Sequence, residues 1–475
     1  MTKSLNELSI TEAARGLRAK EFSVRDLWDA CATAAKERNP ELNAYLELFD
    51  ADDAAIESAQ KRIDSGDAPL LCGIPLAMKD NILIEGKIAS AASKMLANYR
   101  ATYDATVTKK LKEDGALFVG RTNMDEFAMG SSTEHSAYGP ARNPLDTSRV
   151  PGGSSGGSSA AVAAHLALGA LGTDTGGSIR QPAAHTGLVG MKPTYGAVSR
   201  SGLIALGSSL DQAGPLTKSV ADAKLLYDVM KGSDPLDATT ITSDTYEKRE
   251  GGATLRIGVP RHLLTEGIDE DVARRFHEVL ARLEAEGHTL VDVSLPTSGY
   301  ALPVYYVIMP AEASANLARF DGVRYGLAER GGSLLEDYVK SRTGGFGAET
   351  IRRILLGTFV LSSGYIDAYY RKADLARGVL RAEYDAAFKS CDVIAFPTTP
   401  SPAFKFGEKS DPVSMYLEDI FTVTANLTGM PAISVPMGNV ERDGVSLPTG
   451  IHFTAPLGAD DLLFKIGALV TGETL

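Results

Sequence analysis

Two glycine–serine runs dominate this sequence: GGSSGGSS at residues 152–159 and DTGGS at residues 174–178. Glycine permits tight turns and lets the backbone approach a ligand closely. The almost wholly apolar stretch 160–172 separates the runs, and it opens with the helix formers AAVAA instead of staying polar as a flexible linker would. Two Gly-Gly-Ser turns joined by a buried helix and a strand therefore predict that two serines meet at one place.

The chemistry of such turns has more than one interpretation. Backbone N–H groups gathered at a turn and a helix start bind negative charge, while the serines could be nucleophiles, proton carriers or plain turn residues. A lone GGSSGG run is often a surface loop. The second glycine pair, in which Ser178 is followed by Arg180, Gln181 and Pro182, favours a functional site.

The segment 71–193 resembles the amidase signature family. Three motifs carry the resemblance: GGSSGGS at 152–158, DTGGSIRQP at 174–182, and GIPLAMKDN at 73–81 with a lysine at position 79. Ser154 and Ser178 are 24 residues apart (178 − 154), which fits the family pattern. The resemblance implies an α/β amidase signature fold, with a large mixed central sheet covered by helices on both faces.

The resemblance also implies a catalytic group that contains no histidine. Ser178 would be the nucleophile, and Ser154 would carry its proton to Lys79. The oxyanion would be bound by backbone N–H groups, which the resemblance places at Thr175, Gly176, Gly177 and Ser178. His185, the histidine nearest to Ser178 in the sequence, is the less favoured base.

Lysine acts as a base only when it is uncharged, so Lys79 needs burial and the absence of a carboxylate partner. The apolar residues 74–78 before it fit this requirement. Asp80 would oppose it if its carboxylate met the Lys79 ammonium group. Because most lysines are solvated surface groups, the resemblance is what selects Lys79.

Four further segments resemble, within the same family, the glutamine-hydrolysing subunits of aspartyl/glutamyl-tRNA amidotransferases. They are DEFAMGSSTEHSAYGPARNP (125–144), SSLDQAGPLTKSV (208–220), EASANLARFDG (312–322) and RRILLGTF (352–359). The implied function is a glutaminase whose ammonia amidates Glu-tRNA(Gln) or Asp-tRNA(Asn). Its implied partners are a B subunit, which holds the tRNA and uses ATP with Mg, and a small C subunit.

For glutamine as substrate, the resemblance implies a partner for each charged group, as desolvated charges require. Arg353 would bind the α-carboxylate, Asp419 the α-ammonium group, and Tyr305 would add a neighbouring hydroxyl. The loop Met129, Gly130 and Ser131 would line the same pocket. The ordinary alternative places Arg353 on a solvated helix face and makes Asp419 a helix cap. No metal site and no cofactor are expected in this chain.

One position departs from the resemblance. His452 lies where similar subunits carry a glutamine-like polar residue, and the sequence stops soon after Leu469. The sequence therefore makes no prediction about the C-terminal edge or a partner contact there.

Two other functions remain open. A stand-alone amidase for another small amide would have an apolar pocket in place of Arg353 and Asp419. A non-catalytic module could use the glycine loops to hold a phosphate or nucleotide, but such sites usually add a basic residue, and Arg180 is the only candidate nearby.

Composition limits the class of protein. Of 475 residues, 44% are apolar and 23% are charged, as in soluble globular proteins. No apolar run is long enough to span a bilayer, and the polar start of the chain is unlike a signal peptide, so a cytoplasmic protein is expected. The cysteines Cys31, Cys72 and Cys391 are too far apart for a zinc pattern or a disulfide framework, which favours buried free thiols.

The charge balance argues against this chain holding tRNA alone. The net charge is −12, and the small basic cluster Lys248-Arg249 has an acid on each side. Affinity for nucleic acids depends largely on basic contacts with phosphates. The chain also contains no GxxxxGK[ST] loop for ATP.

We expect a single domain over 1–475, with a signature core at 71–193, a surface excursion at 232–254 and a mostly helical region at 300–384. Ser9 with Glu12 and Ser23 with Asp26 predict two capping boxes, and Trp28 is expected in the core. Periodicity predicts strands at 74–78, 116–120, 168–173, 256–260, 289–295, 393–396 and 432–436, and helices at 106–112 and 269–286.

Overall fold

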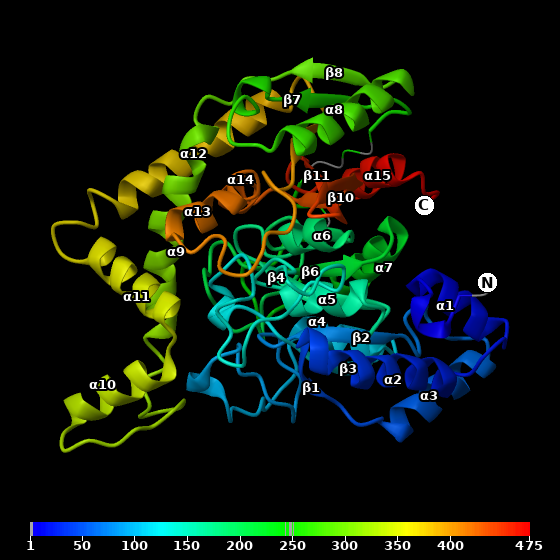
Figure 1. Cartoon of the computed structure of the whole chain (residues 1–475), viewed down its shortest axis with the longest axis horizontal. Coiled ribbons are helices and arrows are strands. Elements are labelled where there is room, and N and C mark those ends of the chain that lie inside the picture. Colours follow the sequence, from blue (N-terminus) through cyan, green and yellow to red (C-terminus); the bar gives the residue numbers. More distant parts are fainter. Residues whose placement is uncertain (1–2, 243, 247–248, 250) are drawn as a thin grey trace.

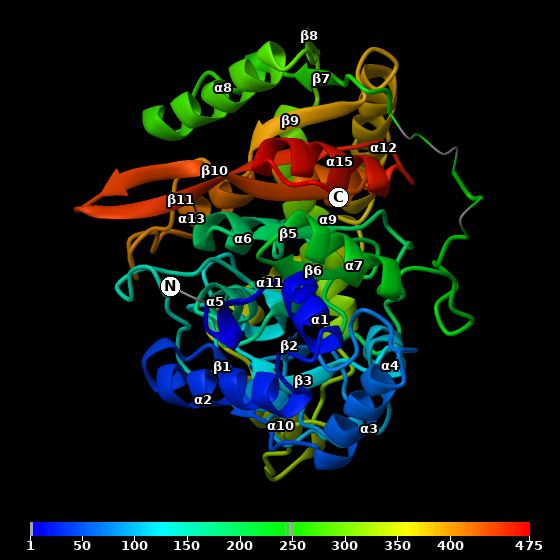
Figure 2. The ribbon, with the colours of Figure 1, turned by 90° about the vertical axis from the view of Figure 1, so that its right-hand side faces the viewer.

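The computed structural model describes residues 3–242, 244–246, 249 and 251–475, and a sheet of eleven strands runs through this part of the chain (Figures 1 and 2). The strand order is β1-β3-β2-β4-β6-β5-β10-β11-β9-β7-β8. The strands are β1 Tyr45–Leu48, β2 Pro75–Lys79, β3 Leu117–Thr122, β4 Gly169–Asp174, β5 Val189–Lys192, β6 Gln212–Thr217, β7 Arg256–Val259, β8 Thr289–Asp292, β9 Val393–Pro397, β10 Ala432–Arg442 and β11 Val445–Thr454. Parallel and antiparallel pairs both occur, so the predicted mixed sheet is confirmed.

Helices cover both faces of the sheet, as predicted. The helices nearest to it are α2 Val24–Leu42, α5 Gly156–Ala163, α6 Arg180–Thr186, α7 Val220–Met230, α8 Glu270–Ala285 and α15 Asp460–Thr471. On β10, Ile433 and Val435 pack against α15, whereas Ser434 between them lies beside Ala184 of α6. Because neighbouring side chains of a strand point to opposite faces, α15 and α6 cover different sides.

The structure confirms the predicted strands as β2, β3, β4, β7, β8, β9 and β10, and the predicted helices as α4 (Thr106–Glu113) and α8. Strand β10 continues to Arg442, and β8 ends already at Asp292. Four strands, β1, β5, β6 and β11, have no counterpart in the predicted set. Gly190 in β5 and Pro215 in β6 disfavour strands by propensity, and tertiary packing overrides that preference.

The N-terminal region agrees with its sequence signals. Both capping boxes are present, at the starts of α1 (Ile10–Arg18) and α2. Trp28 lies on α2 and is buried in the main hydrophobic core. Each of the three cysteines is a buried free thiol.

Residues 300–384 form the helices α9 Ala301–Leu317, α10 Leu334–Gly345, α11 Ala348–Leu361 and α12 Tyr370–Ala387, which run along one side of the sheet in Figure 1. Apolar side chains of α9, α11 and α12 meet loop residues between 91 and 129 in a second hydrophobic cluster. This cluster holds the helical layer against the sheet layer that carries the glycine–serine runs.

The segment 232–254, expected as a surface excursion, is described only in part, because residues 243, 247–248 and 250 lie outside the described residues. Lys248 of the small basic cluster is among them. The first part of the segment is attached to the body, since Asp234 accepts a hydrogen bond from Ser199 Oγ at 2.6 Å. Within the described chain, no helix has both the length and the apolar character to cross a membrane.

We predict that Asp222→Ala destabilises the fold. The buried Asp222 carboxylate accepts the first N–H groups of α1, from Ile10 at 2.9 Å and from Thr11 at 2.9 Å. Removing it leaves these donors unpaired, which costs about 1–3 kcal/mol. A thermal melt should show a lower midpoint, whereas replacing the exposed Asp29 with alanine should leave the midpoint unchanged. An unaltered melt of Asp222→Ala would contradict the prediction.

Candidate active site

Lys79 is the last residue of β2 and is fully buried. Its Nζ lies 2.8 Å from Ser154 Oγ and 2.8 Å from Ser155 Oγ. Thr173 of β4 adds its hydroxyl at 2.9 Å and its carbonyl at 3.2 Å. The predicted meeting of the lysine with the first serine run is therefore present, and it occurs between adjacent parallel strands.

The surroundings of Lys79 favour an uncharged amine. Burial lowers the pKa of Lys79 to about 7, against the opposing effect of the carboxylates of Asp125, Asp174 and Asp211. Asp80 does not oppose it, because its carboxylate pairs with Arg121 at 2.8 Å and accepts the Ala92 N–H at 2.9 Å. Among the described residues, Lys79 forms no salt bridge.

Ser154 and Ser155 are not equivalent partners of this amine. Ser155 Oγ donates to the Thr173 carbonyl at 3.1 Å, so its proton is already bound. Within the described chain, Ser154 Oγ accepts from Lys79 and donates to no protein group. Of the two hydroxyls, only that of Ser154 has no acceptor for its proton among the described residues, and its role as proton carrier stays a prediction.

Ser178 lies in the loop between β4 and α6, and its backbone carbonyl accepts the Ser155 N–H at 3.2 Å. Its side chain is 8% exposed and lines a pocket of about 290 Å³. The hydrogen bond between the Ser155 N–H and the Ser178 carbonyl brings the two serine runs together. No hydrogen bond joins Ser178 Oγ to Ser154 Oγ in the described structure, so the proton path between them stays a prediction.

The backbone of the second run is suited to bind an anion. Across the described residues, the N–H groups of Thr175, Gly176, Gly177 and Ser178 have no hydrogen-bond partner. The Gly176 carbonyl is held from behind by Thr422 Oγ1 at 2.6 Å. A Cβ on Gly176 would lie 2.7 Å from the Tyr305 hydroxyl, so only glycine fits there. Gly176 and Ser178 line the pocket, whereas Thr175 and Gly177 do not.

The pocket also contains every residue predicted for substrate binding. Its wall includes Met129, Gly130, Ser131, Tyr305, Arg353 and Asp419. It combines a cationic group, a carboxylate and the hydroxyl of Ser178 in one space.

Arg353 is 3% exposed and is not on a solvated helix face. Its Nε donates to Glu349 Oε1 at 2.6 Å, and its guanidinium carbon lies 4.7 Å and 4.4 Å from the ring centres of Tyr306 and Tyr416. Within the described chain, Nη1 is buried without a partner. A buried donor without a partner is costly, which points to an anionic ligand at this edge.

Asp419 is buried on the 3₁₀ turn Leu417–Asp419, close to Ser131. Its Oδ2 accepts from Ser131 Oγ at 2.6 Å. Burial raises the pKa of Asp419 to about 7, and the Ser131 bond opposes this rise. A bound ammonium group would return the carboxylate to its charged form.

The structure places three neighbouring residues to which the sequence analysis gave no firm role: His452, Arg180 and His185. His452 lies inside the fold on β11, where its Nε2 meets Arg180 Nη1 at 2.9 Å, and not at an edge. Arg180 pairs with Asp174 at 3.0 Å and donates to Asn426 Oδ1 at 2.7 Å, so it is occupied within the protein. His185 lies 3.9 Å from the Glu418 carboxylate, and burial lowers its pKa to about 3.

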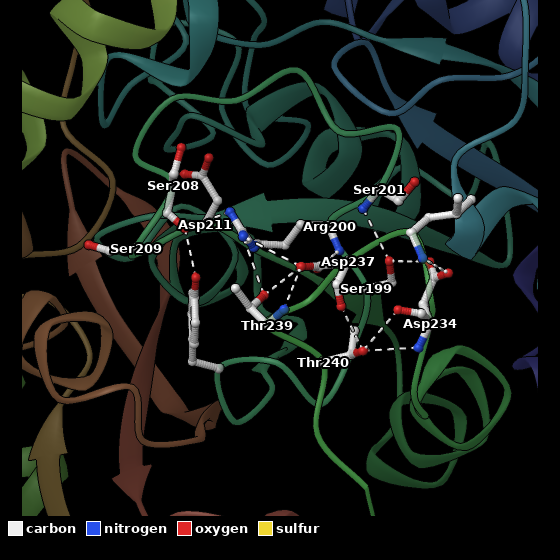
Figure 3. A network of polar contacts seen from close by, with 12 residues as sticks. Ser199, Arg200, Ser201, Ser208, Ser209, Asp211, Asp234, Asp237, Thr239 and Thr240 are labelled. Atoms are coloured by element: carbon white, nitrogen blue, oxygen red, sulfur yellow. Dashed lines mark hydrogen bonds and ion pairs between the residues drawn. The ribbon is translucent and has the colours of Figure 1, made fainter.

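Asp211 supports the second run, and Figure 3 shows this residue near the polar network of Arg200, Asp237 and Thr239. Thr175 Oγ1 donates to Asp211 Oδ1 at 2.7 Å, and the N–H groups of Leu206 and Gly207 donate to the same carboxylate at 2.9 and 3.1 Å. Arg200 ties this loop to Asp237, whose carboxylate accepts the Arg200 N–H at 2.8 Å. The motif SSLDQAGP therefore anchors the loop that precedes Ser178.

Among the pocket residues that were not singled out from the sequence are Tyr306, Tyr416 and Lys409. Tyr306 and Tyr416 stack with ring centres 4.0 Å apart, and Lys409 forms an ion pair with Glu418. Only Tyr306 has a sequence signal, its position next to Tyr305. In the part of the chain that the structure describes, no group of His, Cys, Asp and Glu side chains is arranged to hold a metal ion.

Comparisons with known proteins agree with this arrangement. The family model described as Amidase matches residues 26–464. The chain is 47% identical to the A subunit of glutamyl-tRNA(Gln) amidotransferase from Desulfatibacillum aliphaticivorans, over 98% of this chain and 96% of that protein. The crystal structure of the corresponding protein from Thermotoga maritima matches with a TM-score of 0.80 at 41% identity, over 98% of this chain and 94% of that one.

The fold is also shared with an enzyme whose name gives a different substrate from that of the amidotransferase subunits. The structure of 6-aminohexanoate cyclic dimer hydrolase matches with a TM-score of 0.82 at 26% identity, over 98% of this chain and 97% of that chain. Backbone similarity alone therefore does not identify the substrate.

We predict that amide hydrolysis falls as the pH drops through about 7, because protonated Lys79 has no lone pair for the serine proton. Asp125→Asn removes a negative charge that raises the Lys79 pKa, so the acid limb of the pH–rate profile should move to lower pH. NMR titration of lysines labelled at Cε, with Lys79→Arg for assignment, should locate the same pKa. A Lys79 that titrates near its ordinary value would contradict this prediction.

Proposed function

The chain belongs to the amidase signature family, and from this premise we propose that it is the glutamine-hydrolysing subunit of a tRNA amidotransferase. The observation that carries the proposal is the content of the pocket beside Ser178. Arg353 presents an unpaired guanidinium edge there, within the described chain, and Asp419 presents a carboxylate. Free glutamine offers a carboxylate and an ammonium group to match them.

The same observation argues against the two alternatives. A stand-alone amidase for a neutral amide would not need a buried carboxylate and a buried arginine whose Nη1 lacks a partner within the described chain, because buried polar groups without partners are costly. A phosphate-binding module would need a free cation at the glycine loops, but Arg180 is bound to Asp174 and Asn426.

The proposed reaction proceeds through an acyl-enzyme. Ser178 Oγ attacks the side-chain amide carbon of glutamine while its proton passes through Ser154 to neutral Lys79. The N–H groups of the second run stabilise the oxyanion. The C–N bond then breaks, the proton returns through Ser154 to the leaving nitrogen, and ammonia departs. Water attacks the ester by the same proton path and releases glutamate.

The partners follow from the relatives. Proteins named as the A subunit of glutamyl-tRNA(Gln) amidotransferase belong to multi-subunit enzymes, and we propose the same for this chain. A B subunit would hold the tRNA and use ATP with Mg, a C subunit would join the two, and the ammonia would pass to the B subunit. The net charge of −12 supports a partner that supplies the contacts with tRNA.

Ser178→Ala should lower glutamine hydrolysis by ~10³-fold or more, because the nucleophile is lost. Hydroxylamine should trap a glutamyl hydroxamate with the unaltered protein and none with the variant. Near-normal turnover of Ser178→Ala would refute the mechanism.

Arg353→Lys should raise the KM for glutamine by ~10–100-fold with a smaller change in kcat, because lysine lacks the planar fork that binds a carboxylate. Steady-state kinetics are measured with glutamine and with 4-aminobutanamide, which lacks the α-carboxylate. Comparing the two substrates separates a loss of carboxylate binding from a general loss of activity. If the variant lost activity equally on both compounds, Arg353 would not be the carboxylate site.

A further inference from the structure

We propose that Glu126 is a positioning residue for Arg353. Although it belongs to a distant segment, it caps the helix that carries Arg353 and so holds this arginine where it can recognise the substrate α-carboxylate. The proposal rests on the proposed function, because it assigns Glu126 a part in selecting glutamine over amides without that carboxylate. Glu126 belongs to the motif DEFAMGSSTEHSAYGPARNP. The proposed catalytic mechanism gives this residue no role.

Helix α11 starts at a residue that cannot cap it. Its N-cap is Gly347, which has no side chain to bind the free N–H groups of the first turn. Glu126 Oε2 accepts the Gly347 N–H at 2.7 Å and the hydroxyl of Thr350, the third helical residue, at 2.6 Å. In a capping box, the third residue itself supplies the carboxylate for the N-cap N–H. Here Glu126 supplies it from 221 residues earlier in the chain.

The Glu126 carboxylate is itself fixed. It is 3% exposed, and its other oxygen, Oε1, accepts from Ser93 Oγ at 2.5 Å. A Cβ on Gly347 would lie 2.7 Å from Oε2, so the two segments are in close contact. The rings of the adjacent residues Phe127 and Phe346 meet edge to face with centres 5.6 Å apart, which supports the same junction.

The cap connects directly to the pocket. The first turn of α11 contains Glu349, whose Oε1 accepts from Arg353 Nε at 2.6 Å, and both residues line the pocket. Glu126 also lies two residues before Ala128, with which its own segment enters the pocket wall. Loosening the first turn would therefore move the guanidinium group relative to the rest of the pocket, without touching Ser178 or Lys79.

The test compares Glu126→Gln with the unaltered full-length chain, together with any subunits that co-purify. A glutamine side chain at position 126 keeps the size of the glutamate side chain but lacks its charge and half of its acceptor capacity. We expect KM for glutamine to rise by ~10-fold while kcat changes by less than ~3-fold. The kcat/KM for 4-aminobutanamide should stay within ~2-fold, since this compound does not use Arg353.

A second substitution tests the cap itself. Serine is a preferred N-cap residue, and the extended backbone of Gly347 (φ −73°, ψ 166°) suits it. A Cβ at position 347 would meet Glu126 Oε2 at 2.7 Å, so this substitution is made in a Glu126→Ala protein. There, Gly347→Ser should recover part of the lost affinity for glutamine. Ser333→Ala is the matched control, because it removes the cap of α10, a helix with no residue in the pocket. Its KM should equal that of the unaltered chain.

The outcomes separate this proposal from the proposed function. If the unaltered chain hydrolyses 4-aminobutanamide as well as glutamine, the proposed function itself is wrong. If it prefers glutamine and Glu126→Gln retains the original KM, only the positioning role is overturned. An equal loss on both substrates would also overturn it, because that pattern indicates general damage to the fold.

Discussion

The exclusion of water and of counter-charges from one lysine is the constraint on which the site depends. Lys79 is useful as a base only without its proton, and a nearby carboxylate would restore that proton. The fold meets this requirement by ending β2 between two strands and by directing Asp80 away, to Arg121. The hydroxyls of Ser154, Ser155 and Thr173 remain as the neighbours of the amine.

The acids around the amine each have another task. Asp174 binds Arg180, Asp211 holds the Thr175 hydroxyl, and Asp125 accepts the Thr133 N–H at 2.8 Å. None of them pairs directly with Lys79 in the described structure. Their negative charges act on it at a distance and partly offset the lowering of its pKa by burial. The same carboxylates therefore fix the loops of the site and adjust the protonation of its base.

Much of this arrangement could be predicted from the sequence, because it depends on local signals. Glycine pairs and apolar runs indicated the two serine runs and seven strands, whereas Lys79 was selected by the resemblance to the amidase signature family. The remaining features depend on contacts between distant segments. The strands β5 and β6 have poor strand propensity, Tyr416 reaches the pocket only through the fold, and the cap of α11 comes from Glu126. One local signal was overlooked. Asp443-Gly444 is a typical hairpin turn, with both residues at positive φ, and it could have predicted β11 as the partner of β10.

The reach of the Arg180 side chain has a consequence for how the protein is made. Its guanidinium group is completed by Thr422, Asn426 and His452, between 242 and 272 residues later in the chain. While a ribosome is still synthesising that last part, a buried arginine next to the nucleophile has no partners for several of its donors. A polypeptide that ends before Thr422 therefore lacks the partners that satisfy these donors of Arg180 in the complete fold.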